Sequence, residues 1–144
     1  MDILVINGPN LNLLGTRQPK IYGSLSYQAL CDELEAFAKK LQIKLEIKQT
    51  NFEGIIIDLL HYAHNKNFQG VVLNAAAYTH TSYAIYDAIL AIDVPVVEVH
   101  LTDPKTRTES FRHTSVIENA CVKTFSGEGL QSYINAINFL KVGY

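Results

Sequence analysis

Two short polar segments of the sequence hold side chains that could perform acid–base chemistry. His80 belongs to NAAAYTHTS at residues 74–82, while Glu98 and His100 belong to EVHLTDP at residues 98–104. Residues two apart in a strand share one face, so the Glu98 carboxylate would lie beside the His100 imidazole and could set its orientation and protonation. One histidine alone more often has a structural role, but two of them at the ends of central strands favour catalysis.

A long polar loop follows the first apolar run of the chain. It extends from Asn7 to about Ser24, which is longer than a plain connection in a compact domain, and such loops are usually lids or binding segments. Its glycines form neither a dinucleotide fingerprint nor a phosphate loop with its lysine, so a nucleotide site is not favoured. The polar side chains that it offers are Asn7, Asn10, Asn12, Arg17 and Tyr22.

A basic cluster in TRTESFRH places Arg107, Arg112 and His113 around Phe111. The planar guanidinium is suited to recognising hydroxyl, carboxylate or phosphate groups. A cluster of solvated surface charges would give the same sequence pattern. Together with the other polar segments, this cluster predicts a small enzyme acting on an anionic ligand. The sequence shows no cofactor motif, and these residue types alone do not identify the reaction.

Other reactive residue types have simpler explanations. His61 and His64 share one face of an expected helix, but two histidines without further ligands do not predict a metal site, and we expect half-exposed helix residues. Cys31 and Cys121 each lie in an apolar pattern, which predicts small buried side chains and neither a disulfide nor a nucleophile.

The composition predicts a single globular domain that spans residues 1–144. The net charge of -2 and the absence of any Lys or Arg run argue against a nucleic-acid partner. The first residues lack the basic start and long apolar stretch of a signal peptide, and no segment is long enough to span a bilayer. We therefore expect a cytoplasmic protein without a membrane partner.

Apolar runs and helical periods alternate along the whole chain, which predicts a three-layer α/β domain with a parallel sheet. The first, third and fourth runs are continuously apolar, as in strands covered on both faces, whereas the second and fifth alternate with polar residues as edge strands can. This pattern matches the flavodoxin-like order 2-1-3-4-5, whose ligand crevice adjoins the carboxyl ends of strands 1 and 3. The expected strands are 3–6, 43–47, 71–73, 96–99 and 121–125, and the expected helices lie around 30–41, 56–63, 84–92 and 130–140.

Serines mark the expected helix starts. Ser26 is the expected N-cap of the first helix, and Thr81 or Ser82 would cap the third. Such a cap explains the hydroxyls of the 74–82 segment, but it does not explain Asn74 and His80 beside the expected crevice.

Several motifs resemble the signature of the type II 3-dehydroquinate dehydratases, in the family's order and across nearly the whole chain. They are NGPNLNLLG at 7–15 with Thr16, Arg17, Pro19 and Tyr22-Gly23, QTNFEG at 49–54, AYTHTS at 77–82, EVHL at 98–101 and FRH at 111–113. The resemblance implies a flavodoxin-like lyase that removes water from 3-dehydroquinate by anti elimination through an enolate, giving 3-dehydroshikimate. It implies no metal, Schiff base or cofactor. The same reaction serves the shikimate pathway of aromatic amino acid biosynthesis and quinate breakdown.

The resemblance also implies the catalytic roles. Tyr22 matches the base that removes a proton from C2; since a free tyrosine has a pKa of ~10, its phenolate costs about 4 kcal/mol to form at pH 7. Arg17 matches the cation that offsets this cost. Asn10 matches the residue that holds a water against the enolate oxygen. His100, oriented by Glu98, matches the acid that protonates the departing C1 hydroxyl.

Further matches imply how the substrate is bound. Asn74 and the backbone amides of Leu101 and Thr102 match the carboxylate site, and the ring-hydroxyl positions match His80 and Arg112. Asp87 matches a residue inserted into the site of a neighbouring subunit, although an exposed helix charge explains it as well. This match implies a homo-oligomer, typically a dodecamer built as a tetramer of trimers.

The chain departs from the family pattern at several positions. Gln18 replaces a usual Glu on the lid, and Tyr86 replaces the Arg expected before Asp87. Ala75 and Ala76 replace a usual Pro-Gly, so a positive φ at the second position would strain Ala76. The segment 107–111 holds one extra residue, which leaves Arg107 as a lid contact only.

Two other functions are compatible with parts of this pattern. A flavodoxin-like FMN carrier would share the fold, but it needs a Ser/Thr-rich phosphate loop after the first strand. A catalytically inactive homologue would tolerate the departures, but it would not need Arg17, Tyr22 and His100.

Overall fold

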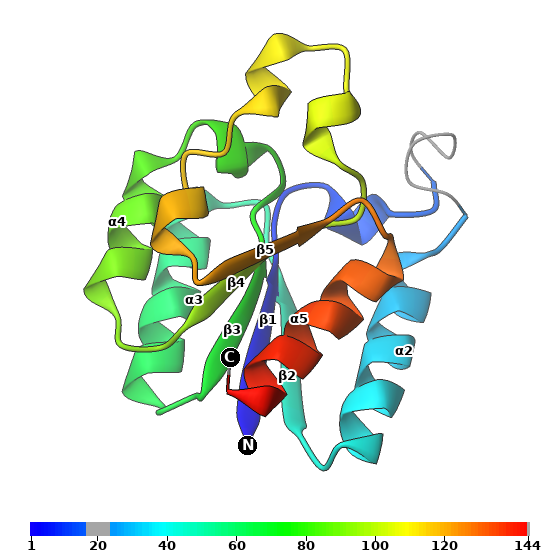
Figure 1. Ribbon diagram of the computed structural model, residues 1–144, viewed down its shortest axis with the longest axis vertical. Helices are drawn as coiled ribbons and strands as arrows, with labels where there is room; N and C mark the ends of the chain where they lie inside the picture. The colour runs from blue at the N-terminus through cyan, green and yellow to red at the C-terminus, as the bar shows by residue number, and fades with distance from the viewer. Residues whose placement is uncertain (17–23, 144) are drawn as a thin grey trace.

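The computed structural model describes residues 1–16 and 24–143. Its centre is a five-stranded sheet in the order β2-β1-β3-β4-β5, with every neighbouring pair parallel (Figure 1). This is the order predicted from the apolar pattern. The strands are β1 (Asp2–Asn7), β2 (Lys44–Gln49), β3 (Gly70–Asn74), β4 (Val96–His100) and β5 (Lys123–Ser126).

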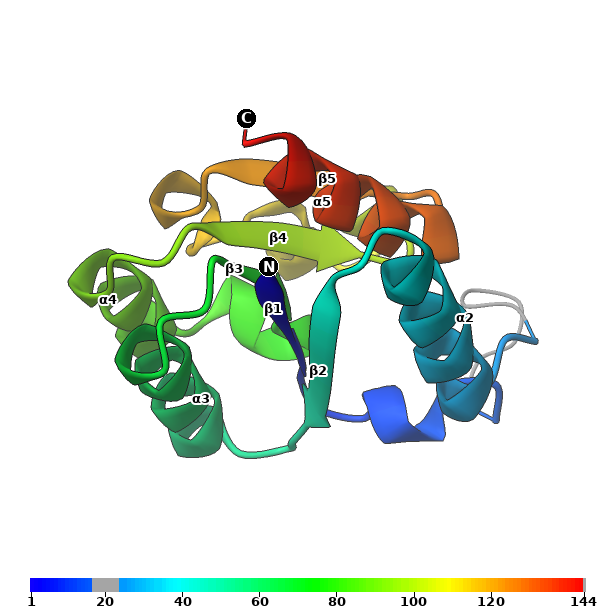
Figure 2. The same ribbon diagram turned by 90° about the horizontal axis from the view of Figure 1, so that it is seen from below.

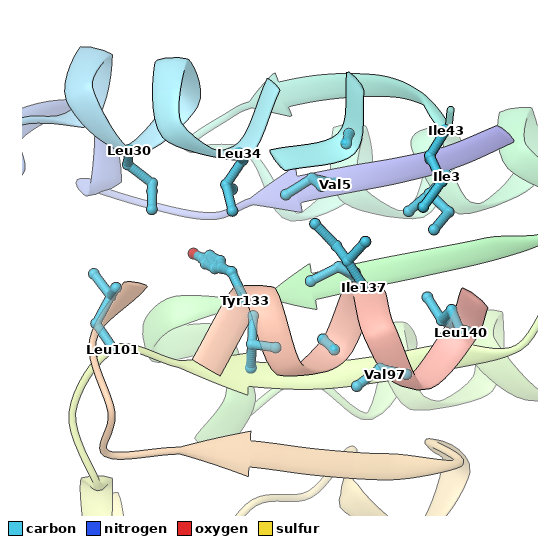
Figure 3. Packing of buried hydrophobic residues seen from close by; sticks show 14 of the residues in the cluster. Ile3, Val5, Leu30, Leu34, Ile43, Val97, Leu101, Tyr133, Ile137 and Leu140 are labelled. Carbon is cyan, nitrogen blue, oxygen red and sulfur yellow. The ribbon is translucent and has the colours of Figure 1, made fainter. Parts of the chain in front are cut away.

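Helices cover both faces of the sheet, which completes the predicted three layers. Figure 2 shows α3 (Glu53–Asn65) and α4 (Tyr83–Ala91) on one face, and α2 (Tyr27–Lys40) and α5 (Leu130–Val142) on the other. Burying one large apolar side chain contributes roughly 1.5–3 kcal/mol, so these two layers supply most of the driving force for folding. In Figure 3 the layer of α2 and α5 packs Leu30, Leu34, Ile137 and Leu140 against the strand residues Ile3, Val5 and Val97.

Local hydrogen bonds determine where two of the helices begin. Ser26 is the N-cap of α2, and its hydroxyl accepts from the Ala29 amide at 3.0 Å. Ser82, not Thr81, is the N-cap of α4 and accepts from the Ile85 amide at 3.0 Å. Both caps satisfy amides that a helix leaves unpaired at its start.

The fifth strand begins later than predicted. The short helix η5 (Glu118–Ala120) ends with the Cys121 amide donating to the Glu118 carbonyl at 3.1 Å, so the chain still turns at Cys121. The pairing with β4 starts at Lys123. An apolar pattern does not report such a turn, because it follows burial and not backbone direction.

Both cysteines are free thiols and are half-buried, so the predicted burial of these side chains is only partial. Burial nevertheless raises the pKa of the Cys31 thiol, and it holds the pKa of Cys121 far above its ordinary value. Both thiols are therefore neutral at physiological pH. The predicted half-exposure of the α3 histidines is confirmed for His64, which accepts from the Asp93 amide at 3.2 Å, whereas His61 is exposed.

Short helical turns gather beyond the carboxyl ends of the strands, at the top of Figure 1. These turns carry most of the polar segments that the sequence singled out. They are η1 (Leu11–Leu13), η2 (Ala76–His80), η3 (Pro104–Thr106) and η4 (Ser110–His113).

Candidate active site

A cavity of about 160 Å³ lies at the carboxyl ends of the strands, where the sequence predicted a ligand crevice. Three loops contribute to its wall, those that follow β1, β3 and β4. The residues that line it are Pro9, Asn10, Leu11, Asn74, Ala76, Ala77, His80, His100, Leu101, Thr102, Pro104, Arg107 and Arg112. The cavity thus unites predicted site residues that are distant in sequence.

The Glu98–His100 pair forms as the period of the strand predicted. Nε2 of His100 lies 2.6 Å from Oε2 of Glu98, and the two residues are only 8% and 1% exposed. Because a carboxylate accepts hydrogen bonds, this contact assigns the Nε2 proton to a bond with Glu98. Nδ1 is then the ring nitrogen with which His100 can exchange a proton with a ligand.

Two hydroxyls that the sequence did not single out complete the surroundings of Glu98. Ser115 donates to Oε2 at 2.9 Å, and Thr124, on β5, donates to Oε1 at 3.3 Å. The buried carboxylate therefore has donors on both oxygens, as a buried charge requires. Nothing in the local sequence indicates either residue, since the two lie 17 and 26 positions from Glu98.

Asn74 is held at the end of β3 by a chain of buried groups. Its Oδ1 accepts from the Ala76 amide at 3.1 Å, and its Nδ2 donates to the hydroxyl of Tyr133 at 2.9 Å. The same hydroxyl donates to Oδ1 of Asn7 at 2.6 Å. Asn7 is the partner of Asn74 in the β1–β3 register, so a residue on α5 connects the ends of two central strands.

The loop after β1 is hydrogen-bonded to the segment 49–54, which holds the QTNFEG motif of the family resemblance. The Asn10 amide donates to Oδ1 of Asn51 at 3.1 Å, and Gln49 Nε2 donates to the Gly8 carbonyl at 3.2 Å. Asn10 itself has a φ of 71°, a left-handed conformation that asparagine tolerates better than most residues. These bonds hold Asn10 at the rim of the cavity.

His80 and Arg112 meet at Phe111. The Nδ1 atom of His80 lies 2.8 Å from the Thr114 carbonyl, so Nδ1–H donates there and Nε2 is left as an acceptor. The His80 ring contacts Phe111 edge to face at 5.9 Å, and the Arg112 guanidinium lies 4.8 Å from the same ring centre. Phe111 thus holds together two predicted ligand-binding side chains.

Glu109 adds a partner to Arg112 that the sequence did not suggest. Its Oε2 accepts from Nε of Arg112 at 3.2 Å. A hydrogen bond from its own backbone amide, and then the Arg112 charge, lower the pKa of Glu109. Arg107, predicted as a lid contact only, belongs to the cavity wall, and its carbonyl lies 2.6 Å from Nε2 of His113.

Among the described residues, two predicted site residues are absent from the cavity wall: Glu98, which bonds the wall residue His100, and Asp87. Asp87 is exposed on α4 and is absent from the cavity wall of its own chain. Arg17 and Tyr22 lie outside the described residues, as does Gln18.

The predicted strain at Ala76 is confirmed. Ala76 has a φ of 53°, in the left-handed region that favours glycine. The turn after β3 thus keeps the conformation that a glycine would adopt, although an alanine occupies it. The close packing of this turn against the loop after β1 requires Gly8, because a Cβ at that position would lie 2.7 Å from the Ala75 carbonyl oxygen.

Residues 1–16 and 24–143 contain no group of three or more His, Cys, Asp or Glu side chains that could hold a metal ion. No helix within those same ranges is both long and apolar enough to cross a membrane.

Comparison with known proteins assigns the chain to a family. A family model described as dehydroquinase class II matches residues 1–141. A 3-dehydroquinate dehydratase of Caldicellulosiruptor bescii is 48% identical over 139 residues, which cover 96% of this chain and 95% of that protein. Another, from an Exiguobacterium species, is 51% identical over 140 residues, which cover 97% of this chain and 94% of that protein.

Solved structures agree with the sequence relatives. The crystal structure of a type II dehydroquinase from Butyrivibrio crossotus has a TM-score of 0.95 at 45% identity and covers 97% of each chain. A 3-dehydroquinate dehydratase-like protein from Bifidobacterium longum has a TM-score of 0.74 at 28% identity, covering 99% of this chain and 96% of that one. With its parallel sheet order, its cavity at the strand ends and these matches over nearly its full length, the chain belongs to the dehydroquinase class II family.

Proposed function

We propose that this chain converts 3-dehydroquinate to 3-dehydroshikimate and that residues 1–144 act as one catalytic domain in the cytoplasm. The observation that carries the proposal is the buried Glu98–His100 pair, joined at 2.6 Å, in which His100 lines the cavity. The family and the names of the relatives supply the substrate. The pair supplies a proton donor whose orientation is fixed before the substrate binds.

The reaction proceeds by anti elimination through an enolate. Tyr22, as phenolate, takes the proton from C2, and the electron pair of that C–H bond passes into the enolate of the neighbouring ketone. Arg17 stabilises the phenolate, and Asn10 holds a water against the enolate oxygen. The enolate then re-forms the ketone, C1 loses its hydroxyl group to a proton from Nδ1 of His100, and water leaves. One proton must return from Tyr22 to His100 before the next turnover.

The remaining wall residues bind the substrate. Asn74 and the backbone amides of Leu101 and Thr102 bind the carboxylate. His80, through Nε2, and Arg112 bind the ring hydroxyls. Asp87 faces the site of a neighbouring copy in a homo-oligomer, a dodecamer built from trimers, which agrees with its exposure on α4.

The test follows the ultraviolet absorbance of the conjugated product when 3-dehydroquinate is mixed with the purified chain in the presence of a chelator. We expect turnover by the intact chain, a fall in kcat of about 10²–10⁴-fold in His100→Asn, and abolished turnover in Tyr22→Phe. The exposed His61, on α3, provides the matched control, and His61→Asn should keep full activity.

Each result bears on a different part of the proposal. Full activity in Tyr22→Phe or in His100→Asn would refute the role of that residue and leave the reaction standing. No turnover by the intact chain would refute the reaction itself and favour an inactive homologue.

A further inference from the structure

Tyr133 is fully buried, yet its hydroxyl reaches the functional end of the sheet. The residue is 0% exposed and packs among the apolar side chains between α5 and the strands. Figure 3 shows its side chain extending from α5 toward β1 and α2. A buried hydroxyl requires hydrogen-bond partners, and this one finds them in Asn7 and Asn74.

The direction of each hydrogen bond in this group follows from the number of protons available. A tyrosine hydroxyl has one proton, and it is donated to Oδ1 of Asn7 at 2.6 Å. The hydroxyl oxygen can therefore only accept from Asn74, whose Nδ2 lies 2.9 Å away. Oδ1 of Asn74 accepts from the Ala76 amide at 3.1 Å, which gives the side-chain amide the same orientation from its other end.

These bonds leave one group of Asn74 for a ligand. An asparagine amide has two N–H groups, and Tyr133 takes one of them. Asn74 lines the cavity, so the second N–H is the group that can serve a ligand there. If the amide were flipped, its carbonyl oxygen would face an anionic ligand and repel it.

We propose that Tyr133 is a positioning residue, which holds the side-chain amide of Asn74 so that one N–H is directed at the substrate carboxylate. This inference rests on the proposed function and deepens it. Burial keeps Tyr133 protonated and therefore a donor, because it holds the pKa of the hydroxyl above its ordinary value. Asn7 is oriented in turn by Tyr27, whose hydroxyl lies 3.4 Å from Nδ2 of Asn7.

The variant Tyr133→Phe removes only the hydroxyl and keeps the ring that packs in the core. We expect KM for 3-dehydroquinate to rise about three- to tenfold, as for the loss of one hydrogen bond, with kcat changed less than about twofold. Tyr62→Phe is the matched control. It also removes a tyrosine hydroxyl, one that bonds Glu46 at 2.8 Å between α3 and β2, and KM should not change.

A double-mutant cycle separates positioning from a general loss of structure. In an Asn74→Ala background, Tyr133→Phe should cause no further rise in KM, because its effect acts through the absent amide. An equal rise in both backgrounds would overturn the inference, and so would an unchanged KM in the single variant. Turnover by the intact chain is measured first, because a lack of turnover would refute the proposed function. A failure of the positioning role is then seen only in the KM values of the variants.

A further measurement is made on the intact chain, so it tests the inference even if Tyr133→Phe does not fold. With ¹⁵N-labelled asparagine, and Asn74→Ala to assign the signal, one side-chain amide proton of Asn74 should exchange slowly with solvent. Addition of 3-dehydroshikimate should shift the other proton. Fast exchange of both protons, or a shift of the slow one alone, would overturn the inference.

Discussion

At the residue scale, Ala76 shows that the turn after β3 keeps a left-handed conformation without the glycine that this conformation favours. Its φ of 53° orients the turn that carries the Asn74 side chain and the η2 residues of the cavity wall. The Ala76 amide also donates to Asn74, so the strained residue supports a predicted ligand-binding group directly. Strain of this kind persists only where surrounding contacts determine the conformation.

Ala76→Gly should therefore raise the free energy of unfolding by about 0.5–1 kcal/mol, since glycine adopts a positive φ without a Cβ clash. Chemical denaturation of the two proteins measures the difference. Ala77→Gly is the matched control, because Ala77 follows in η2 and is not among the described residues with positive φ. It should be destabilised by a similar amount. Equal destabilisation of both variants would contradict the strain at Ala76.

At the scale of elements, the site depends on two loops that touch at Gly8. The Gly8 amide donates to the Asn74 carbonyl at 2.8 Å, so the loop after β1 lies directly against the turn after β3. A Cβ added at Gly8 would lie 2.7 Å from the Ala75 carbonyl oxygen. The Cβ is attached rigidly to the backbone and the oxygen is a backbone atom, so neither can rotate away as the end of a side chain would. Asn10 follows two residues later, so a displacement of this loop would displace Asn10 as well.

Gly8→Ala should force the loops apart, with a loss of about 1–3 kcal/mol in stability and a fall in kcat/KM of at least about tenfold. Gly54→Ala is the control, because a Cβ there meets nothing within 4 Å among the described atoms and its helical position favours alanine. That variant should keep its activity and be slightly more stable. Wild-type activity in Gly8→Ala would show that the loop tolerates the shift.

At the scale of the whole molecule, two tyrosines make the free energy of unfolding depend on pH in the alkaline range. Burial raises the pKa of Tyr27 to about 12, and it also holds the pKa of Tyr133 above its ordinary value. In the unfolded chain both titrate near pH ~10. The unfolded state therefore loses protons that the folded state keeps, and stability falls as the pH rises above this value.

We expect the free energy of unfolding to be constant with respect to these groups below pH ~10 and to decline from there through about pH 12. Denaturation at a series of pH values measures the slope. Tyr27→Phe should make the decline shallower, whereas Tyr62→Phe should alter it less, because the bond to Glu46 raises the pKa of Tyr62 by less than burial raises that of Tyr27. A decline that is identical in all three proteins would assign it to other groups.

Much of this architecture follows from the sequence because it depends on neighbouring residues. Continuous and alternating apolar runs distinguish central from edge strands, so the order of all five strands could be predicted. The Ser26 cap and the Glu98–His100 contact are equally local, since a helix start and the two-residue period of a strand involve a few consecutive positions. The positive φ at Ala76 could be anticipated from the glycine that the family pattern expects there.

The tertiary structure alone decided which groups support those local features. Tyr133 and Asn7 lie 126 positions apart, and Ser115 and Thr124 reach Glu98 from other segments. Such contacts depend on the strand register and on how α5 is rotated against the sheet, which no short pattern encodes. The sequence thus determined the fold, the family resemblance and most of the cavity wall. Packing decided how the polar groups of that wall are oriented, because a buried group must find its partners wherever the folded chain places them.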